Sequence, residues 1–376
     1  MKKTLMVAAA SASFFAVAAH AQSSVTLYGI IDAGITYTSN AGGHSNWQQT
    51  SGGIEQSRWG VKGSEDLGNG LKAVFDLENG FNVGNGKFAN DGGEFNRQAY
   101  VGLSSNYGTV TLGRQYDANQ DFLAPLTATG SWGGTSFAHY GNLDNMNTNG
   151  GYSVNNSIKF MSANYAGFSF GGTYGFSNAA GQFANNREYS VGAQYQFQGL
   201  RVAGAYSEMN NPFGSTTGAV DSLSSLGAFT NSATTAALGN TRLRVYGAGA
   251  TYAFGPAQAG VVWTQARLDS TTTAVPTIHQ NNYEVNAKYN LTPALGLGVA
   301  YTYTQQMNND ISQHFNQVGA QADYSLSKRT DLYAEVVYQR ASGANAFVYN
   351  PSTIGMNGVS SSMNQTTATV GLRHRF

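Results

Sequence analysis

Alternation of apolar and polar residues with a period of two is the feature that most constrains the fold of this 376-residue chain. Over 283–291, Tyr, Val, Ala, Tyr and Leu occupy every second position, and Glu, Asn, Lys and Asn lie between them. This pattern is typical of a strand with one apolar and one polar face, because successive side chains point to opposite sides. It recurs along the body of the chain, where no amphipathic helical pattern of comparable quality occurs. The sequence therefore predicts an all-β protein.

We predict about 16 strands, which begin near residues 25, 54, 70, 94, 109, 154, 168, 187, 199, 241, 257, 281, 295, 314, 331 and 366. Seven connections are predicted to be short turns, centred near Gly68, Tyr107, Ala166, Gly199, Pro256, Pro293 and Lys328. The other connections run from about eight to nearly 40 residues and are rich in Gly, Asn and Ser. Short turns at one end, long loops at the other and an even strand number are typical of an outer-membrane barrel.

Composition favours a membrane barrel over the other classes of protein. Charged residues make up 11% of the chain, whereas a soluble globular domain has about 25%. The 12% of aromatic residues exclude a disordered chain, and 20 basic against 20 acidic residues create no field for nucleic acid. No apolar run of about 20 residues follows the first 21, which excludes a helical membrane protein. A barrel of this size is too wide for side chains to fill, so its polar face is predicted to line a water-filled lumen.

The first 21 residues have the pattern of an export signal. Two lysines precede an apolar run over 5–19, and a small-x-small pattern ends at Ala21. The run is too short for a membrane anchor, which is the weaker alternative. We therefore predict a signal peptide over 1–21 and a single mature domain over 22–376. Removal of the two lysines leaves a formal charge of 18 − 20 = −2, and no cysteine is present to form a disulfide.

The last strand alternates up to the aromatic residue that ends the chain. Its apolar face holds Ala368, Val370, Leu372, His374 and Phe376, and its polar face holds Thr369, Gly371, Arg373 and Arg375. A terminal Phe that closes such a strand resembles the assembly signal of outer-membrane barrel proteins. We therefore predict that Phe376 is the residue recognised during assembly.

Four segments carry a resemblance to one family: VTLYGIID at 25–32, SRWGVKGSEDLGNGLKA at 57–73, NRQAYVGL at 96–103 and LGRQY at 112–116. Together they resemble the Gram-negative general porins of the β-proteobacterial type, over essentially the whole mature chain. The resemblance implies a homotrimer of 16-stranded antiparallel transmembrane β-barrels in the outer membrane, with a long third outer loop folded into each lumen. It also implies a non-specific channel for passive diffusion of small hydrophilic solutes and ions, without a cofactor.

The expected partners follow from that location. They are outer-membrane lipid and lipopolysaccharide, the barrel-assembly machinery acting through the C-terminal strand, and small ions and solutes; nucleic acid is not among them. An enzyme is not predicted, because the G-x-S-x-G match at 167–171 begins a strand with no helix after it, and the histidines lack metal-ligand spacing. An outer-membrane enzyme and a plugged structural barrel stay as alternatives, which a conductance measurement distinguishes from a porin.

The segment from Asp117 to about Ser153 is the longest connection, and it follows the fifth strand, where the third outer loop is expected. Apolar residues lie inside it, namely Phe122, Leu123, Leu126, Trp132 and Phe137. A loop in water has little use for such residues, so we predict that it folds against the inner wall. Its negative charge at the pore constriction is predicted to come from Asp117, Asp121 and Asp144.

The opposite wall of the constriction is predicted to be basic. Arg58 and Lys62 alternate with apolar neighbours and are placed in the lumen, because a cation facing lipid costs about 2–4 kcal/mol at mid-bilayer. Lys72 is assigned to the same wall. Arg97 and Arg114 match constriction arginines of the family, although simple alternation puts them on the face of lipid-facing residues. A β-bulge, or an apolar inner wall under the loop, would resolve that conflict.

Cations on one wall and carboxylates on the loop would create a transverse field that orients hydrated solutes. The basic residues predict a mild preference for anions. The alternative is a neutralised wall, because Asp76 and Glu78 share the face of Lys72 beside Arg58.

Overall fold

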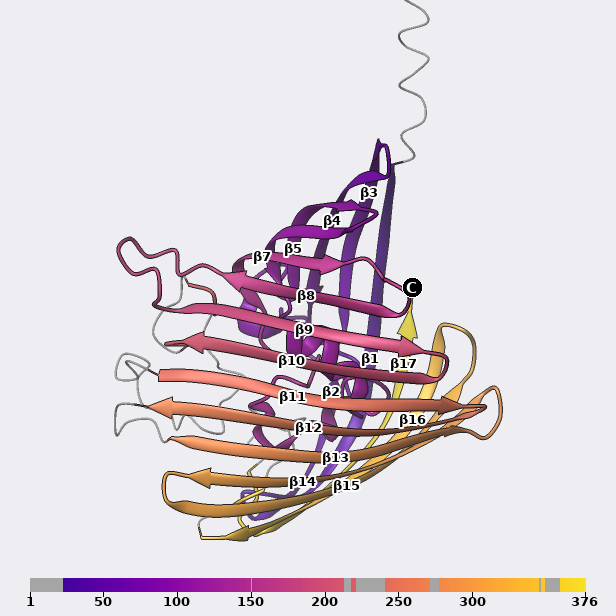
Figure 1. The fold of residues 1–376 in the computed structure, drawn as a ribbon. Helices are drawn as coiled ribbons and strands as arrows, with labels where there is room; N and C mark the ends of the chain where they lie inside the picture. The colour runs from indigo at the N-terminus through magenta and orange to yellow at the C-terminus, as the bar shows by residue number, and fades with distance from the viewer. Residues whose placement is uncertain are drawn as a thin grey trace, which may run out of the picture.

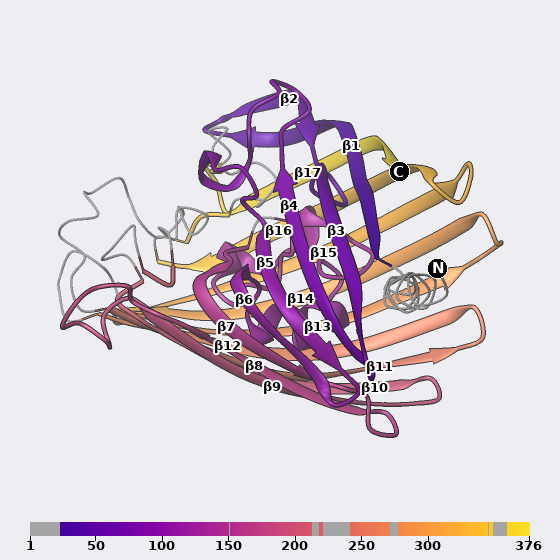
Figure 2. The same ribbon diagram turned by 90° about the horizontal axis from the view of Figure 1, so that it is seen from above.

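The computed structural model describes residues 23–149, 151–212, 218–220, 241–270, 277–344, 346–348 and 359–376, so the predicted signal peptide lies outside the described residues. The strand segments among these residues are β1 (Ser24–Ala41), β2 (His44–Ser51), β3 (Arg58–Gly68), β4 (Leu71–Gly80), β5 (Gln98–Ser105), β6 (Gly108–Gln115), β7 (Val154–Ser162), β8 (Phe168–Gly175), β9 (Arg187–Phe197), β10 (Leu200–Asn210), β11 (Thr241–Phe254), β12 (Ala257–Ser270), β13 (Ile278–Asn290), β14 (Leu295–Asn308), β15 (Ile311–Ser325), β16 (Thr330–Gly343) and β17 (Asn364–Arg375). They form one antiparallel sheet that closes into a barrel because β1 also pairs with β17 (Figures 1 and 2). No helix in these ranges is long and apolar enough to cross a membrane.

The segments β2 and β3 share one position in the barrel. β2 pairs with the second half of β1 and β3 with its first half, and residues 52–57 interrupt the strand between them. The barrel therefore has 17 − 1 = 16 strand positions, as the sequence predicts. The start predicted near residue 54 lies four residues before β3, but the strand position already begins at His44, with β2, which was not predicted. The other predicted starts lie within four residues of the observed ones.

The connections sort to the two ends of the barrel as predicted. All seven short turns are present, after β3, β5, β7, β9, β11, β13 and β15 (Figure 1). Two connections at the other end are shorter than predicted: β1 joins β2 through 42–43, and β14 joins β15 through 309–310. Their strands continue beyond the apolar band into polar sequence, where water on both sides removes the alternation that marks a strand.

Apolar side chains cover the outside of the barrel and polar side chains the inside. On β1, Leu27 and Ile35 are 62% and 60% exposed, whereas Asp32 and Thr36 are fully buried. Exposed aromatic residues gather near the short turns, namely Tyr165, Phe168, Tyr195, Phe197, Tyr252, Phe254, Tyr289 and Tyr324. An apolar outer surface with an aromatic girdle is the surface that a bilayer covers.

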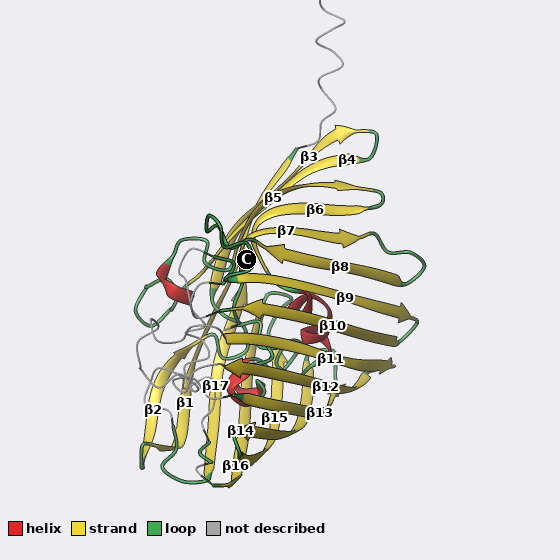
Figure 3. Cartoon of the chain, turned by 60° about the vertical axis from the view of Figure 1, so that its left-hand side comes forward, coloured by secondary structure: helices red, strands yellow, loops and turns green. Residues whose placement is uncertain are grey.

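The connection 116–153 runs inside the ring of strands (Figure 3). It contains the short helical segments η3 (Asn119–Leu123), η4 (Ala124–Leu126), η5 (Thr135–Phe137) and η6 (Tyr140–Asn142). Its apolar residues pack on inward-facing residues of the wall, among them Val262, Ala300 and Val337. Glycines on the wall leave room for its aromatic rings, since a Cβ at Gly298 would collide with Trp132. We call this connection the lumen loop.

Candidate functional site: the charged wall of the lumen

One carboxylate joins two arginines on the wall formed by β3–β5. Glu78 Oε2 lies 3.2 Å from Arg58 Nε, and its Oε1 lies 2.7 Å from Arg97 Nε. Arg58 faces the lumen because it pairs with Ile30, one of the inward positions of β1. Arg97 also donates to the Thr148 carbonyl oxygen of the lumen loop at 3.2 Å. Charges with so little exposure require such partners, so this group is held rigidly.

The interruption between β2 and β3 folds into the lumen around a buried carboxylate. Asp32 accepts hydrogen bonds from the backbone N–H groups of Gly53, Ile54 and Glu55 at 3.2, 3.0 and 2.8 Å. The Tyr333 hydroxyl donates to the same carboxylate at 2.6 Å. Several donors on one carboxylate fix a backbone turn firmly. Asp32 therefore explains why the strand breaks here and why residue 55 lies in the lumen.

Glu55 connects Arg58 to two further arginines on the last strand. Its Oε1 lies 3.0 Å from Arg58, and its Oε2 lies 2.9 Å from Arg373 and 3.0 Å from Arg375. Asp331 lies 3.0 Å from Arg373 and 2.8 Å from Arg375, and Asp323 lies 3.1 Å from Arg373. We call this continuous set the charged belt: Arg97, Glu78, Arg58, Glu55, Arg373, Arg375, Asp331 and Asp323.

Sequence reasoning did not assign five of the eight residues of the charged belt to the wall: Glu55, Asp323, Asp331, Arg373 and Arg375. It placed Arg373 and Arg375 on the polar face of the last strand without assigning them to the pore wall, and two arginines at alternate positions were a sufficient signal. Glu55 carried no signal, because it lies where the strand breaks. In this belt four guanidinium groups contact four carboxylates. Of the two carboxylates in the neutralised-wall alternative, Glu78 belongs to the belt, whereas Asp76 lies outside it, opposite Lys62 in register.

The conflict over the parity of Arg97 and Arg114 has two local causes. Arg97 precedes the first residue of β5, so strand alternation does not apply to it. At Arg114 the register of β6 against β7 shifts between Gly113 and Gln115, which is the bulge that alternation required. The Arg114 guanidinium donates to the Asn96 carbonyl oxygen at 2.9 Å and to the Asn155 side-chain oxygen.

The two lysines lie apart from the arginines. Lys62 is opposite Asp76 in register, with its Nζ 5.0 Å from the centre of the Tyr28 ring. Lys72 lies near the turn end of β4. It is eight residues from Gly80, the residue that pairs with Arg58, so Lys72 and Arg58 are about 25 Å apart along the strands. The assignment of Lys72 to the constriction is therefore wrong.

The predicted negative face of the lumen loop is also wrong for two of its three carboxylates. Asp117 and Asp144 are fully buried. Asp117 accepts from the Gln120 N–H at 2.9 Å, and burial raises the pKa of Asp117 to about 6. Asp121 forms an ion pair with Lys159 of β7. Asp117 and Asp144 bind within the protein and present no carboxylate to a solute.

A buried histidine fastens the lumen loop to the wall. His139 Nδ1 lies 2.6 Å from Asp144 Oδ2, and its Nε2 lies 2.9 Å from Glu284 Oε2 on β13. Asp144 also accepts from Thr264 at 2.6 Å and from Asn282 at 3.0 Å. Burial alone would lower the pKa of His139, but the two carboxylates outweigh it and raise the pKa to about 10. The charged imidazole therefore bridges loop and wall at neutral pH.

Comparison with known proteins identifies the family. A family model described as Gram-negative porin matches residues 8–344. The chain belongs to the Gram-negative porin family. An outer membrane porin of Bordetella pertussis is 39% identical over 248 residues, which are 59% of this chain and 63% of that protein. Outer membrane porin protein 32 of Delftia acidovorans is 29% identical over 385 residues, with full coverage of both chains. The anion-selective porin from Comamonas acidovorans has 25% identity and a TM-score of 0.74, over 94% of this chain and 100% of that one.

This porin is an outer-membrane protein, and its C-terminal residue closes the barrel. The Phe376 N–H donates to the Gly29 carbonyl oxygen at 3.0 Å, and the Gly29 N–H donates to the Phe376 carbonyl oxygen at 3.1 Å. The Phe376 side chain is 42% exposed on the lipid side. The backbone of Phe376 therefore pairs with Gly29 while its ring lies at the outer surface, so a substitution of the side chain leaves the pairing in place.

Proposed function

We propose that this porin is a diffusion channel for small hydrophilic solutes with a mild preference for anions, in which Arg58, Arg97, Arg114 and Lys62 act on the passing solute. The burial of Asp117 and Asp144 carries the proposal. Because these carboxylates are bound inside the protein, the lumen loop presents little negative charge to the pore. The positive charge of the arginines on the wall then favours the passage of anions. The related porin whose printed name is anion-selective supports the same preference.

Replacing Arg58, Arg97 and Arg114 together with alanine is expected to abolish or reverse the anion preference, because three cations are removed and Glu78 loses both of its arginine partners, while all four carboxylates of the charged belt stay. The measurement is the reversal potential of purified protein in a planar bilayer with asymmetric salt. Lys328→Ala/Arg329→Ala is the control, since both side chains are exposed in a short turn. Cation preference of the native protein, or unchanged selectivity of the triple variant, would contradict the proposal.

The proposal includes assembly as a homotrimer, contact with outer-membrane lipid and lipopolysaccharide, and recognition of Phe376 by the barrel-assembly machinery. An outer membrane protein of Vibrio cholerae with a similar fold, 17% identical, is described in a trimer form, which supports the first of these. Enzymatic activity is no part of the proposal.

Phe376→Ala is expected to lower the amount of folded protein in the outer membrane several-fold, while Phe376→Tyr keeps it near the native amount. Both variants retain the backbone pairing with Gly29, so only recognition of the aromatic ring distinguishes them. The measurement is heat-modifiable mobility of the membrane fraction on a gel. Equal amounts of both variants would show that the ring is not an assembly signal.

A further inference from the structure

Basic residues form a row on the outside of the barrel, at the loop end of β11–β13. Arg244 pairs across the sheet with Arg267, and Arg267 pairs with His279. Arg267 shares the outward face of β12 with Val261, which is 56% exposed, whereas its two neighbours Ala266 and Leu268 point inward and are buried. This row therefore faces away from the lumen and from the charged belt.

The outward-facing residues of β12 change from apolar and aromatic to amide and then to charged toward the loop end of the barrel. Its successive residues are Val261, Trp263, Gln265, Arg267 and Asp269. Tryptophan and tyrosine mark the level at which the headgroups of a bilayer begin, and Trp263 packs against Tyr246 with ring centres 5.8 Å apart. The charged residues follow directly above this level. Because the long loops of such barrels are extracellular, the row lies at the headgroups of the outer leaflet.

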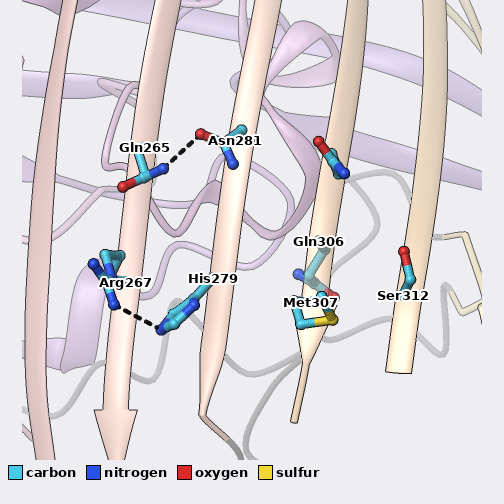
Figure 4. Close-up of a pocket in the computed structure, with 8 residues that line it drawn as sticks. Gln265, Arg267, His279, Asn281, Gln306, Met307 and Ser312 are labelled. Atoms are coloured by element: carbon cyan, nitrogen blue, oxygen red, sulfur yellow. Dashed lines mark hydrogen bonds between the residues drawn. The ribbon is translucent and has the colours of Figure 1, made fainter. Parts of the chain in front are cut away.

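Cations outnumber carboxylates in this row. Asp269 lies 3.6 Å from Arg242 and 3.5 Å from His279 and also pairs with Arg244. The other carboxylate beside this row within the described part of the chain is Glu208, opposite Arg244 in register, which accepts from the Tyr206 hydroxyl at 2.8 Å. Arg267 donates to His279 Nε2 at 3.3 Å (Figure 4). Among the residues that the structure describes, the Nε atoms of Arg244 and Arg267 have no hydrogen-bond partner.

A pocket of about 270 Å³ opens beside Arg267 and His279. Gln265, Asn281 and Ser312 give it amide and hydroxyl groups, and Met307 gives it an apolar side (Figure 4). Gln265 and Asn281 are hydrogen-bonded to each other at 2.7 Å, so this part of the pocket is ordered. The layers run from guanidinium groups through amides to aromatic rings.

We propose that the contact with lipopolysaccharide, which is part of the proposed function and on which this inference rests, has a defined site: the outward row, Arg242, Arg244, Arg267 and His279, binds the phosphates of this glycolipid of the outer leaflet. Guanidinium groups bind phosphate oxygens in pairs of parallel hydrogen bonds. The amides and the hydroxyl of the pocket match sugar hydroxyls, and the aromatic and apolar residues below match acyl chains. The position at headgroup level selects a membrane lipid over a free phosphate ion.

The test compares native trimer with Arg244→Gln/Arg267→Gln in detergent without divalent cations. Bisphosphorylated lipopolysaccharide is expected to bind the native protein and to bind the variant about tenfold or more weakly, since each cation near a membrane surface contributes about 1 kcal/mol. The control Lys328→Gln/Arg329→Gln removes the same charge at the turn end and is expected to bind like the native protein.

Enzymatically dephosphorylated lipopolysaccharide is expected to bind native protein and variant equally, and inorganic phosphate is expected to compete only weakly. Three results would overturn the proposal. They are equal binding of bisphosphorylated lipopolysaccharide by variant and native protein, full competition by inorganic phosphate, and loss of the trimer in the Arg244→Gln/Arg267→Gln variant, which would make the row an interface between copies. Unchanged channel conductance of the variant shows that its barrel is folded.

Discussion

Replacing His139 with leucine is expected to detach the lumen loop and to lower the free energy of unfolding by about 3–5 kcal/mol. The imidazole lies between the carboxylates of Asp144 and Glu284, and all three side chains have no exposed surface. Without the imidazole, two negative charges stay buried with only neutral donors around them. Expulsion of the loop relieves that repulsion, so single-channel conductance should become larger and noisier. Thermal denaturation and planar-bilayer recording measure the two effects.

Two further variants separate charge from packing at this site. His139→Leu/Asp144→Asn/Glu284→Gln removes the imidazole and both carboxylate charges, so it should recover part of the lost stability and a quieter channel. His44→Asn is the control for loss of a histidine, because His44 is exposed on β2. If His139→Leu alone leaves both stability and conductance at native values, the loop is not held by this ion pair.

The ion pairs of His139 hold the lumen loop over a defined pH range. Because the pKa of His139 rises from 6.5 to about 10 on folding, its contribution to stability is complete below about pH 6.5 and is lost as the pH rises through about 10. The pKa of Asp144 is lowered from 3.8, so its contribution is present above about pH 4 and is lost only as the pH falls through that lowered value. Noise in the native channel should therefore rise above about pH 10 and resemble that of the leucine variant.

The barrel could be predicted because a bilayer imposes a simple rule on each strand. Lipid on one side and water on the other force alternation through residues such as those of 283–291, and turns between strands end it. The rule fails where water lies on both sides. The segment β2, HSNWQQTS, has Trp47 as its one large apolar residue, so it reads as a polar loop and not as part of the second strand.

The sequence predicts which face of a strand carries a charged residue, but it does not predict which side chains that residue contacts. Parity placed Arg58 on the correct face, but the partners of a charge come from distant parts of the chain. Asp144 binds Thr264 and Asn282, which lie 120 and 138 positions away in sequence. Glu55 reaches Arg373 across 318 positions. Nothing in the local sequence distinguishes a carboxylate that faces the pore from one that fastens the loop.

Replacing Glu55 and Glu78 together with glutamine is expected to raise the preference for anions about fivefold. Both carboxylates contact Arg58, and each also contacts a second arginine of the charged belt. Glutamine keeps the size and the hydrogen-bonding oxygen but removes two negative charges from a balanced wall. A unit charge acting on an ion about 8 Å away in water contributes about 0.5 kcal/mol, so the two charges together contribute about 1 kcal/mol, which corresponds to about a fivefold change in permeability ratio.

Two comparisons make this result specific to the wall. Glu65→Gln/Glu94→Gln removes the same net charge from exposed sites outside the belt and should leave the reversal potential unchanged. The effect of Glu55→Gln/Glu78→Gln should also shrink as salt rises from about 0.1 M to about 1 M, because the screening length falls from about 10 Å to about 3 Å. A shift of equal size in both double variants, or one that is independent of salt, would show that the charged belt does not set selectivity. A shift confined to the belt variant and to low salt would mean that solutes sense the neutralisation of these arginines, so that the carboxylates on the wall keep the preference for anions mild.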